Sequence, residues 1–526
     1  MQESSHPFDL PPEVTLHIFS FLDQPRDIAN VSLVNKKWNS ITSENSLWRG
    51  IYKKTWDSPP VPNFMQVLGS PSVSRANSPL HRSKMSDRKA KEEDKKESEE
   101  EEEEENGLRQ SMKDVFRQKK RLEARWLSGK NPFTHSFIAH EQFPVNALKF
   151  VVSSASSSYD EANADAVLVT CSDDKTIKVW RPSGEEEASA EDKRRNKEHR
   201  LSNPPPALSC THTLSAHQSL VWSVDFDGST IVSASHDESV IVWREGEPVK
   251  TFNNVHPGGV NGVIFQQNRA LTRGREAKEM SLLDIEKGEA VMTIRQDSTG
   301  IFAATASLPN DLAISSTGPI FKCWDLRSGE CIGSGSREDQ RRARLEVLRL
   351  CQGESNNHYL SIGDSEGDCT IWDLRHLSSS SSSGEDKPLV ACFNHGLSPI
   401  CALHFDTTKL VSGSKDGVIR VWNNGLFGGR EDSSSRKNFY YSLKDSSNDS
   451  QKRDGGRDID CKLLIHLKRK LWCFQADDRA LVCGDRGGAV HILDFGAINE
   501  ETLRPERRQL LGSGGTSENP PSCSMQ

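Results

Sequence analysis

The chain has 526 residues, of which 34% are hydrophobic, a formal net charge of −8 and a mean hydropathy of −0.64. This length exceeds one ordinary core and predicts one large domain with smaller parts. No apolar run reaches the roughly 18–20 residues of a membrane span, no signal peptide is apparent, and the charge argues against dominant nucleic-acid binding. We therefore expect an intracellular protein, nuclear or cytoplasmic, without a membrane or nucleic-acid partner. Its 12 cysteines include no Cys-x-x-Cys pair and are expected to be free thiols, not metal ligands or disulfides.

Residues 7–56 have the pattern of a compact helical unit. Pro11 and Pro12 stand where a helix can begin, because a first-turn proline loses no intrahelical hydrogen bond. Apolar residues then recur at helical spacing in three segments: Val14, Ile18 and Leu22; Ile28, Val31, Val34 and Trp38; Leu47, Trp48 and Ile51. Three short helices cannot cover this much apolar surface, so we expect part of it to dock on a partner.

The order of these residues resembles an F-box, from Leu10-Pro11-Pro12-Glu13 to Leu47-Trp48, with Ile28 where leucine is usual and Asn35 where cysteine is usual. The alternative is an unrelated helical hairpin with a coincidental apolar pattern. The resemblance implies binding to a Skp-type adaptor and, through it, to a cullin-based ubiquitin ligase. It also implies the adaptor-binding set: Leu10, Pro11, Ile18, Leu22, Ile28, Val31, Val34, Trp38, Leu47 and Trp48.

Two segments connect this unit to the rest of the chain. Residues 57–107 contain few apolar side chains, three Ser-Pro pairs, a basic cluster and an acidic block at 99–105, which predicts a disordered linker. The Ser-Pro pairs and the basic cluster fit phosphorylation sites and a nuclear signal, but a plain solvated linker is the favoured interpretation of both. Residues 108–130 predict a charged helical linker with one packed face, formed by Leu108, Met112, Val115, Phe116 and Leu122 and ending near Trp126. Residues 497–526 are expected to be a disordered tail.

An internal repeat organises residues 133–496. Five tryptophans each close a short strand-like run, and Leu283 and Leu493 stand as degenerate equivalents; the five are Trp180, Trp243, Trp324, Trp372 and Trp422. The short gaps between these end points fit a four-stranded blade of about 40–45 residues, and insertions at 181–209, 376–388 and 423–460 explain the long gaps. The alternating run 133–139 precedes the first repeat, whereas residues 463–493 supply only three strands. We therefore expect 133–139 to complete the last blade and close the ring.

The repeat resembles a WD-repeat β-propeller, a binding platform. The fold class we expect is an all-β seven-bladed WD-repeat propeller with an N-terminal α-helical F-box and a helical linker. In intact WD repeats a histidine, a serine or threonine, an aspartate and the tryptophan form a buried hydrogen-bonded chain. Three repeats keep this tetrad: His140, Thr170, Asp174 and Trp180; His217, Ser233, Asp237 and Trp243; His395, Ser412, Asp416 and Trp422. The resemblance makes this chemistry structural and implies no catalytic residue.

Ligands of propellers usually meet the face that carries the turn before the aspartate and the start of each inner strand. Transferring these positions, with two arginines near the third blade's turn, gives a candidate substrate-binding set: Trp222, Asn261, Arg273, Arg275, Lys415, Trp472 and Arg486. Trp222 and Trp472 are equally consistent with packing in the ring wall.

Two functions stay open at this point. The first is a substrate-recognition subunit of an SCF-type ubiquitin ligase, with the F-box docking the adaptor and the propeller binding an unknown target protein. The second is a non-catalytic scaffold that organises a nuclear or cytosolic complex without ligase activity. An enzyme acting alone is disfavoured, since the sequence has no phosphate-binding loop, paired-cysteine motif or credible nucleophile. No cofactor is expected.

Overall fold

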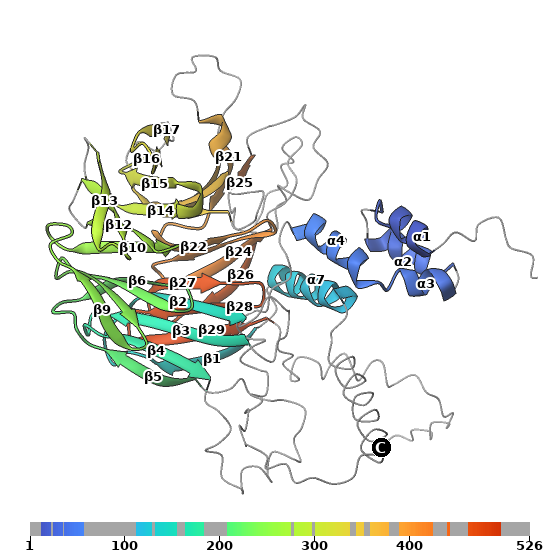
Figure 1. The fold of residues 1–526 in the computed structure, drawn as a ribbon, viewed down its shortest axis with the longest axis horizontal. Coiled ribbons are helices and arrows are strands. Elements are labelled where there is room, and N and C mark those ends of the chain that lie inside the picture. The colour runs from blue at the N-terminus through green and yellow to red at the C-terminus, as the bar shows by residue number, and fades with distance from the viewer. Residues whose placement is uncertain are drawn as a thin grey trace, which may run out of the picture.

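The computed structural model describes residues 12–22, 25–34, 36–56, 112–128, 132–154, 164–182, 208–274, 278–296, 300–336, 343–351, 358–377, 389–423, 439–441 and 461–495. The expected linker at 57–107 and tail at 497–526 lie outside these residues. Figure 1 shows two parts, a group of N-terminal helices and a stack of twisted sheets, with helix α7 between them.

Four short helices form the N-terminal unit: α1 (Pro12–Phe19), α2 (Pro25–Ser32), α3 (Lys36–Ile41) and α4 (Asn45–Trp56). Both α1 and α2 begin at a proline, as the missing N–H allows. The single helix that the sequence predicts from Ile28 to Trp38 is divided into α2 and α3, because the chain turns at Leu33 and Val34, whose N–H groups donate to Asn30 and Val31. Among the described residues, no helix is long and apolar enough to cross a lipid bilayer.

Helix α7 (Met112–Ser128) belongs to both parts of the molecule. Its first turns place Met112 and Phe116 in the core of the N-terminal unit, and its last turns place Leu122 and Trp126 in a core of the sheets. Of the predicted packed face, Met112, Phe116 and Leu122 are buried, Val115 is half-buried, and Leu108 lies outside the described residues. This face is divided between the N-terminal unit and the sheets.

The strands in the described part of the chain pair into seven sheets, the blades of a propeller, so the expected fold is confirmed. Blades 1 to 4 each contain four strands, given from the innermost outward: β2 (Val145–Ser154), β3 (Ala164–Ser172), β4 (Ile177–Pro182) and β5 (Leu208–Leu214); β6 (Val221–Phe226), β7 (Thr230–Ser235), β8 (Val240–Arg244) and β9 (Glu247–Phe252); β10 (Val260–Gln266), β11 (Arg269–Gly274), β12 (Glu279–Asp284) and β13 (Glu289–Arg295); β14 (Ala303–Ser307), β15 (Leu312–Thr317), β16 (Ile320–Asp325) and β17 (Cys331–Ser336).

Blades 5 to 7 complete the ring. Their strands, in the same order, are β18 (Leu345–Leu350), β19 (Tyr359–Asp364), β20 (Asp368–Asp373), β21 (Leu389–Asn394) and β25 (Phe439–Tyr441); β22 (Ile400–Phe405), β23 (Lys409–Ser414), β24 (Val418–Asn423) and β26 (Cys461–His466); β27 (Leu471–Ala476), β28 (Ala480–Asp485), β29 (Ala489–Asp494) and β1 (Phe133–Ile138). Second strands such as β7 are buried throughout, whereas outer strands such as β5 are mostly exposed. In the described part of the chain, a buried apolar cluster lies between each pair of neighbouring blades, so the core is distributed around the ring.

The ring closes with a strand from the start of the domain. Strand β1 pairs antiparallel with β29, from Phe133 opposite Asp494 to Ile138 opposite Ala489. Beyond the strand, the N–H groups of Ala139 and His140 donate to the Gly488 carbonyl at 2.9 and 3.0 Å. The predicted strand exchange is confirmed.

The structure changes the bounds or the content of each predicted insertion. Arg181 pairs with Ser209 in the ladder between β4 and β5, so the first insertion is 183–207. The second is limited to residues 378–388, because a short 3-10 helix, η4 (Leu374–His376), and Leu377 follow β20. The third, expected at 423–460, contains β25, which adds a parallel fifth strand to blade 5 beside β21.

Candidate protein-binding surfaces

An apolar surface is exposed on the N-terminal helices. Val14, Ile18 and Phe21 are spaced by four and three residues along α1 and the turn after it, so they share one face, and Ile18 and Phe21 are 47% and 69% exposed. Leu33 and Val34, in the turn after α2, are 83% and 60% exposed. Large apolar side chains exposed this fully are typical of protein-interaction surfaces.

The core beneath this surface is already filled. Ile28, Leu47 and Trp48 are buried, and the Trp48 indole N–H donates to the Thr42 carbonyl at 2.7 Å. These three were predicted to contact an adaptor, and the structure corrects this, because their side chains hold α2 and α4 against the other helices. Leu22, Val31 and Trp38 are half-buried against the same core, and Leu10 and Pro11 lie outside the described residues. Of the described members of the predicted set, Ile18 and Val34 are the most exposed.

Trp126 anchors α7 to the propeller. Its indole is 1% exposed, stacks on Phe495 with 3.7 Å between ring centroids, and donates its N–H to the Asp478 carbonyl at 2.8 Å. The Arg125 guanidinium adds a hydrogen bond to the Phe495 carbonyl at 3.0 Å. Helix α7 also contacts blade 6, where the Lys409 ammonium of β23 lies 5.1 Å from the centroid of the Trp126 ring.

A second contact joins the N-terminal helices, α7 and the propeller at one residue. The Lys119 ammonium of α7 pairs with the Asp478 carboxylate of the β27–β28 turn at 2.7 Å and lies 5.0 Å from the Tyr52 ring of α4. Burial would lower the pKa of Lys119, but Asp478 raises it above its ordinary value; burial also raises the pKa of Tyr52 to about 12. Lys119 is therefore a fixed cation between α4 and blade 7.

The predicted tetrads are complete in blades 1 and 2. In blade 1 the two nitrogens of His140 bond Asp174 at 2.7 Å and Thr170 at 2.9 Å, and the Trp180 indole donates to Thr170 at 3.0 Å. In blade 2 the hydrogen bonds follow the same order. His217 bonds Asp237 at 3.0 Å and Ser233 at 2.8 Å, and the Trp243 indole donates to Ser233 at 2.8 Å. Burial would raise the pKa of Asp237, but hydrogen bonds from Ser239 and Gln218 lower it to about 2.

Blade 6 departs from the prediction. His395 bonds Ser412 through Nδ1 at 2.6 Å, so its Nε2 atom is buried without a partner, and Asp416 bonds Ser414 and the Val418 N–H instead of the histidine. Burial, and then the charge of Arg420, lower the pKa of His395 to about 4.

Two other blades keep part of the hydrogen-bonded tetrad, formed by residues that the repeat pattern did not identify. In blade 4 the amide of Gln296 takes the histidine's place and bonds Ser315, which also accepts from the Trp324 indole at 2.9 Å. In blade 3, His256 bonds Thr272 at 3.0 Å. The register shift at Leu283 matches those at the tryptophans of other blades, which confirms Leu283 as their equivalent.

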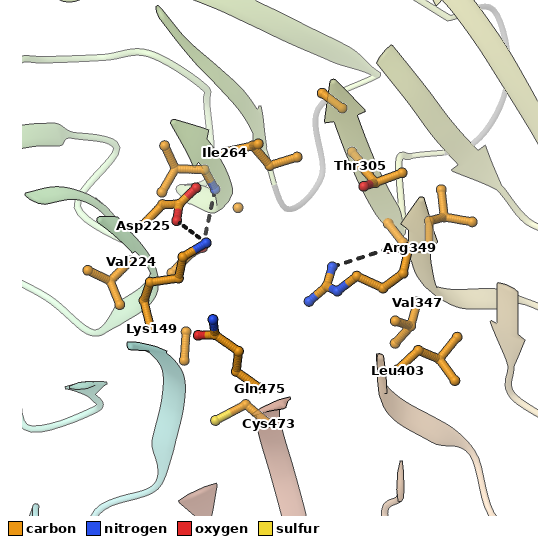
Figure 2. Close-up of a pocket in the computed structure, with 18 of the residues that line it drawn as sticks. Lys149, Val224, Asp225, Ile264, Thr305, Val347, Arg349, Leu403, Cys473 and Gln475 are labelled. Carbon is orange, nitrogen blue, oxygen red and sulfur yellow. Dashed lines mark hydrogen bonds and ion pairs between the residues drawn. The ribbon is translucent and has the colours of Figure 1, made fainter. Parts of the chain in front are cut away.

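A cavity of about 530 Å³ lies at the centre of the propeller, walled by the inner strands of all seven blades. Its first layer contains Asn146, Trp222, Asn261, Glu346 and Trp472, at the end of the channel that carries the aspartate turns. Figure 2 shows residues of the second layer, three positions further along each inner strand, where Lys149 and Asp225 face Arg349 across the opening. This second layer consists of Lys149, Asp225, Ile264, Thr305, Arg349, His404 and Gln475.

The structure separates the predicted substrate-binding set into three groups. Trp222, Asn261 and Trp472 line the first layer of the cavity, whereas Lys415 and Arg486 lie on turns at the rim, where Lys415 pairs with Glu346 at 3.5 Å. Arg275 lies outside the described residues. Arg273, predicted near a turn, belongs to strand β11 and lines the cavity. Binding of a target by these residues stays a prediction.

The second layer was missed from the sequence. Counting three residues along the inner strand from the predicted Trp222 would have located Asp225, whereas no residue three positions before Arg349 was predicted. Neither belongs to a recurring motif, so pattern matching alone does not detect them. In the described part of the chain, no group of three or more histidine, cysteine, aspartate or glutamate side chains is arranged to hold a metal ion.

Family models match both parts of the chain. The F-box-like model matches residues 8–54, and the model of the WD domain, G-beta repeat, matches residues 131–181, 208–244 and 387–423. The three matched repeats are those in which the sequence keeps the full tetrad. F-box and WD40 domains are generally non-catalytic adaptor domains, and neither match is to an enzyme family.

Curated relatives match one part or the other. Ribosome biogenesis protein YTM1 of Eremothecium gossypii is 25% identical over 49% of this chain and 53% of its own length. F-box/LRR-repeat protein 5 of Xenopus tropicalis is 48% identical over 9% of this chain and 7% of its own length. Mitochondrial division protein 1 of Pyricularia oryzae is 26% identical over 41% and 36%. The match thus spans about half, or less, of the length of each of these curated relatives.

Among solved structures, the WD40 β-propeller domain of Doa1 is similar with a TM-score of 0.46 and 14% identity, covering 69% of this chain and 96% of that one. The propeller assignment itself rests on the seven paired sheets and the matched repeats. These features define a class of modular binding proteins, in which a helical docking unit is joined to a propeller. By its two domains, the chain is an F-box/WD-repeat protein.

Proposed function

We propose that this chain is the substrate-recognition subunit of an SCF-type ubiquitin ligase, acting in the nucleus or cytoplasm. In this role the F-box docks a Skp-type adaptor, and through it a cullin, while the propeller binds a target protein. The observation that carries the proposal is the exposed apolar surface of α1 and the α2 turn, on a unit whose own core is already filled.

The exposed side chains are suited to act as interface anchors. Ile18, Phe21, Leu33 and Val34 remain exposed although the unit packs tightly, so covering them needs no rearrangement of its core. A handful of such anchors carries most of the energy of a small interface, each contributing about 2 kcal/mol or more. The adaptor is the occupant that the F-box-like match favours.

The α7 connection supports a receptor rather than two independent binding domains. Trp126 fixes one end of α7 to blade 7, and Met112 and Phe116 place the other end in the F-box core. The Asn45 side chain of α4 accepts from the Met112 N–H at 2.8 Å and so fixes the start of α7. A target held on the propeller would therefore stay at a set distance from the adaptor, as ubiquitin transfer to that target requires.

The propeller offers a mouth with aromatic side chains for the target. Trp222 and Trp472 line the first layer of the cavity, and Lys415 and Arg486 lie at its rim. Aromatic and arginine side chains are enriched among the residues that dominate protein interfaces.

The test is adaptor binding by purified full-length protein. The double variant Ile18→Asp and Val34→Asp should lose adaptor binding by roughly 100-fold or more, because two anchors are replaced by charges. The matched control is Leu397→Asp, which puts the same charge on a propeller residue that is 98% exposed. Thermal melting of both variants checks that the propeller stays folded. Undiminished adaptor binding by the double variant would overturn the proposal.

A scaffold without ligase activity is the second candidate, favoured by the names of the propeller relatives, which refer to ribosome biogenesis and mitochondrial division. Proteins that co-purify with the full chain distinguish the two. Adaptor and cullin in near-stoichiometric amounts support the receptor, and their absence from a complex with other proteins supports the scaffold.

A further inference from the structure

Arg273 is an unusual residue for its position in the ring. It pairs with Gly262 of the inner strand in blade 3. The six equivalent positions in the second strands of the other blades all carry small side chains, namely Cys171, Ala234, Ser316, Gly363, Gly413 and Gly484. A long cationic side chain stands only here among these seven positions, which lie in the tightly packed wall of the propeller.

Gly262 gives this side chain a path into the channel. A Cβ atom on residue 262 would lie 2.8 Å from the Arg273 Nε and 3.2 Å from its Cγ, so any larger residue would displace the arginine. The guanidinium therefore crosses the inner strand where that strand has no side chain, and it lines the central cavity.

Arg273 has no ion-pair partner among the described residues. Its Nη1 atom is buried without a hydrogen-bond partner, and in the described part of the chain no carboxylate lies within ion-pair distance of it. Burial, and then the positive charge of Arg349, lower the pKa of Arg273 to about 10, against the smaller opposite effect of Glu346. Such an unpaired buried cation is costly unless something neutralises it.

Arg349 is a second cation without a carboxylate partner in the described residues. It lies on β18, is exposed toward the channel, and donates one hydrogen bond to the Leu348 carbonyl at 3.2 Å. The other charges of the lining are already paired. Lys149 and Asp225 pair at 2.9 Å, and Glu346 lies 3.5 Å from both Arg344 and Lys415. Among the charged groups of the described lining, the two guanidinium groups are therefore the ones without an ion pair.

The wall between the two arginines leaves space for a ligand. Blade 4 separates their blades, and its inner strand β14 consists of small residues, Ala303–Ser307. Figure 2 shows Thr305 of this strand and Arg349 facing the open centre. The cavity of about 530 Å³ can hold a compound of several non-hydrogen atoms as well as its hydration.

We propose that the central channel binds a small phosphorylated compound, with a phosphate group held between Arg273 and Arg349. Guanidinium groups bind phosphate oxygens through paired N–H donors, and the surrounding protein strengthens this interaction relative to water. Arg349 lies in the second layer, beyond Trp222 and Trp472, a depth that suits a small molecule better than a protein segment. This binding site is independent of the proposed ligase role.

The experiment is calorimetric titration of the full chain with sodium pyrophosphate in chloride buffer. The wild type should bind one pyrophosphate per chain, and the double variant Arg273→Met and Arg349→Met should bind at least ten times more weakly. Gly262→Ala keeps both charges but displaces Arg273, so it should also weaken binding. The matched control is Arg295→Met on the outer strand β13, where the side chain is 82% exposed and pairs with Glu279; its affinity should not change.

Three results would overturn the proposal. The first is equal pyrophosphate affinity of the wild type and the double variant. The second is an equal loss in Arg295→Met, which would mean that general surface charge attracts the anion. The third is binding of a phosphoserine peptide through Arg273 with no binding of pyrophosphate, which would assign the channel to a protein segment. Melting curves without phosphate show whether each variant is folded; Arg273→Met should melt no lower than the wild type, because it removes an unpaired buried charge.

Discussion

Replacing Trp126 by alanine should release α7 from the propeller without unfolding the blades. The indole is 1% exposed, stacks on Phe495 and donates to the Asp478 carbonyl, so the change removes its packing, the stack and one hydrogen bond together. Truncation of a buried tryptophan costs about 3–5 kcal/mol. At about 1.4 kcal/mol per factor of ten, local opening of this contact should become roughly 100 to 4,000 times more frequent.

Hydrogen exchange measured by mass spectrometry reports this opening directly. Amides in the last turns of α7 should exchange faster, while those of the buried strand β28 should keep their rates. Trp126→Phe retains a ring to stack on Phe495 and loses the N–H donor, so it should cost only about 1 kcal/mol. Arg117→Ala, on an exposed face of the same helix, is the control, since its pair with Asp114 contributes little.

Two results would refute this reasoning. If α7 exchange were unchanged in Trp126→Ala, the helix would be held by contacts other than the tryptophan. If β28 exchanged as fast as α7, the tryptophan would support the whole ring and not only the joint.

Two further predictions concern the ring itself. Gly488→Ala should lower the melting temperature much more than Gly318→Ala: both glycines have positive φ, but a Cβ on Gly488 would lie 1.5 Å from the His140 carbonyl oxygen, whereas Gly318 has no atom within 4 Å of that position. Equal melting temperatures would show that strain alone, and not the closure contact, matters. The wild type should lose up to about 3 kcal/mol of stability as pH falls from 6.5 toward 4. In this range His395 becomes protonated in the unfolded chain, whereas in the folded protein it stays neutral because its pKa is lowered to about 4. His395→Gln should flatten this part of the denaturation profile, and an unchanged pH slope would mean that other groups cause it.

The sequence predicted the repeat well because the repeat is a local property. Each blade is a run of neighbouring strands, and a residue such as Trp180 or Leu283 marks the same place in each run. Closure by β1 was predictable for a related reason, since counting strands left the last blade one short. The fifth strand of blade 5 was not predictable, because β25 lies in a polar insertion and pairs with a strand far from it in the chain.

The candidate sites show where sequence reasoning ended. The F-box pattern identified apolar positions, but it did not separate Ile28, which is buried in the core, from Ile18, which is exposed. That distinction depends on how the helices pack, and both residues have the same chemistry. Similarly, Arg273 was noted for its charge, but its path past Gly262 depends on the pairing of two strands.

The closing strand determines the order in which this protein can be completed during synthesis. The ribosome makes α7 and β1 before any blade, yet their partners, Phe495 and β29, belong to the last segment of the propeller. At about 5–20 residues per second, both wait on the order of tens of seconds for those partners to emerge. The F-box core needs only α7 and is ready early. A chain cut short before blade 7 would thus have a complete F-box core beside an open ring. Under the proposed function, it would bind the adaptor without holding a target protein.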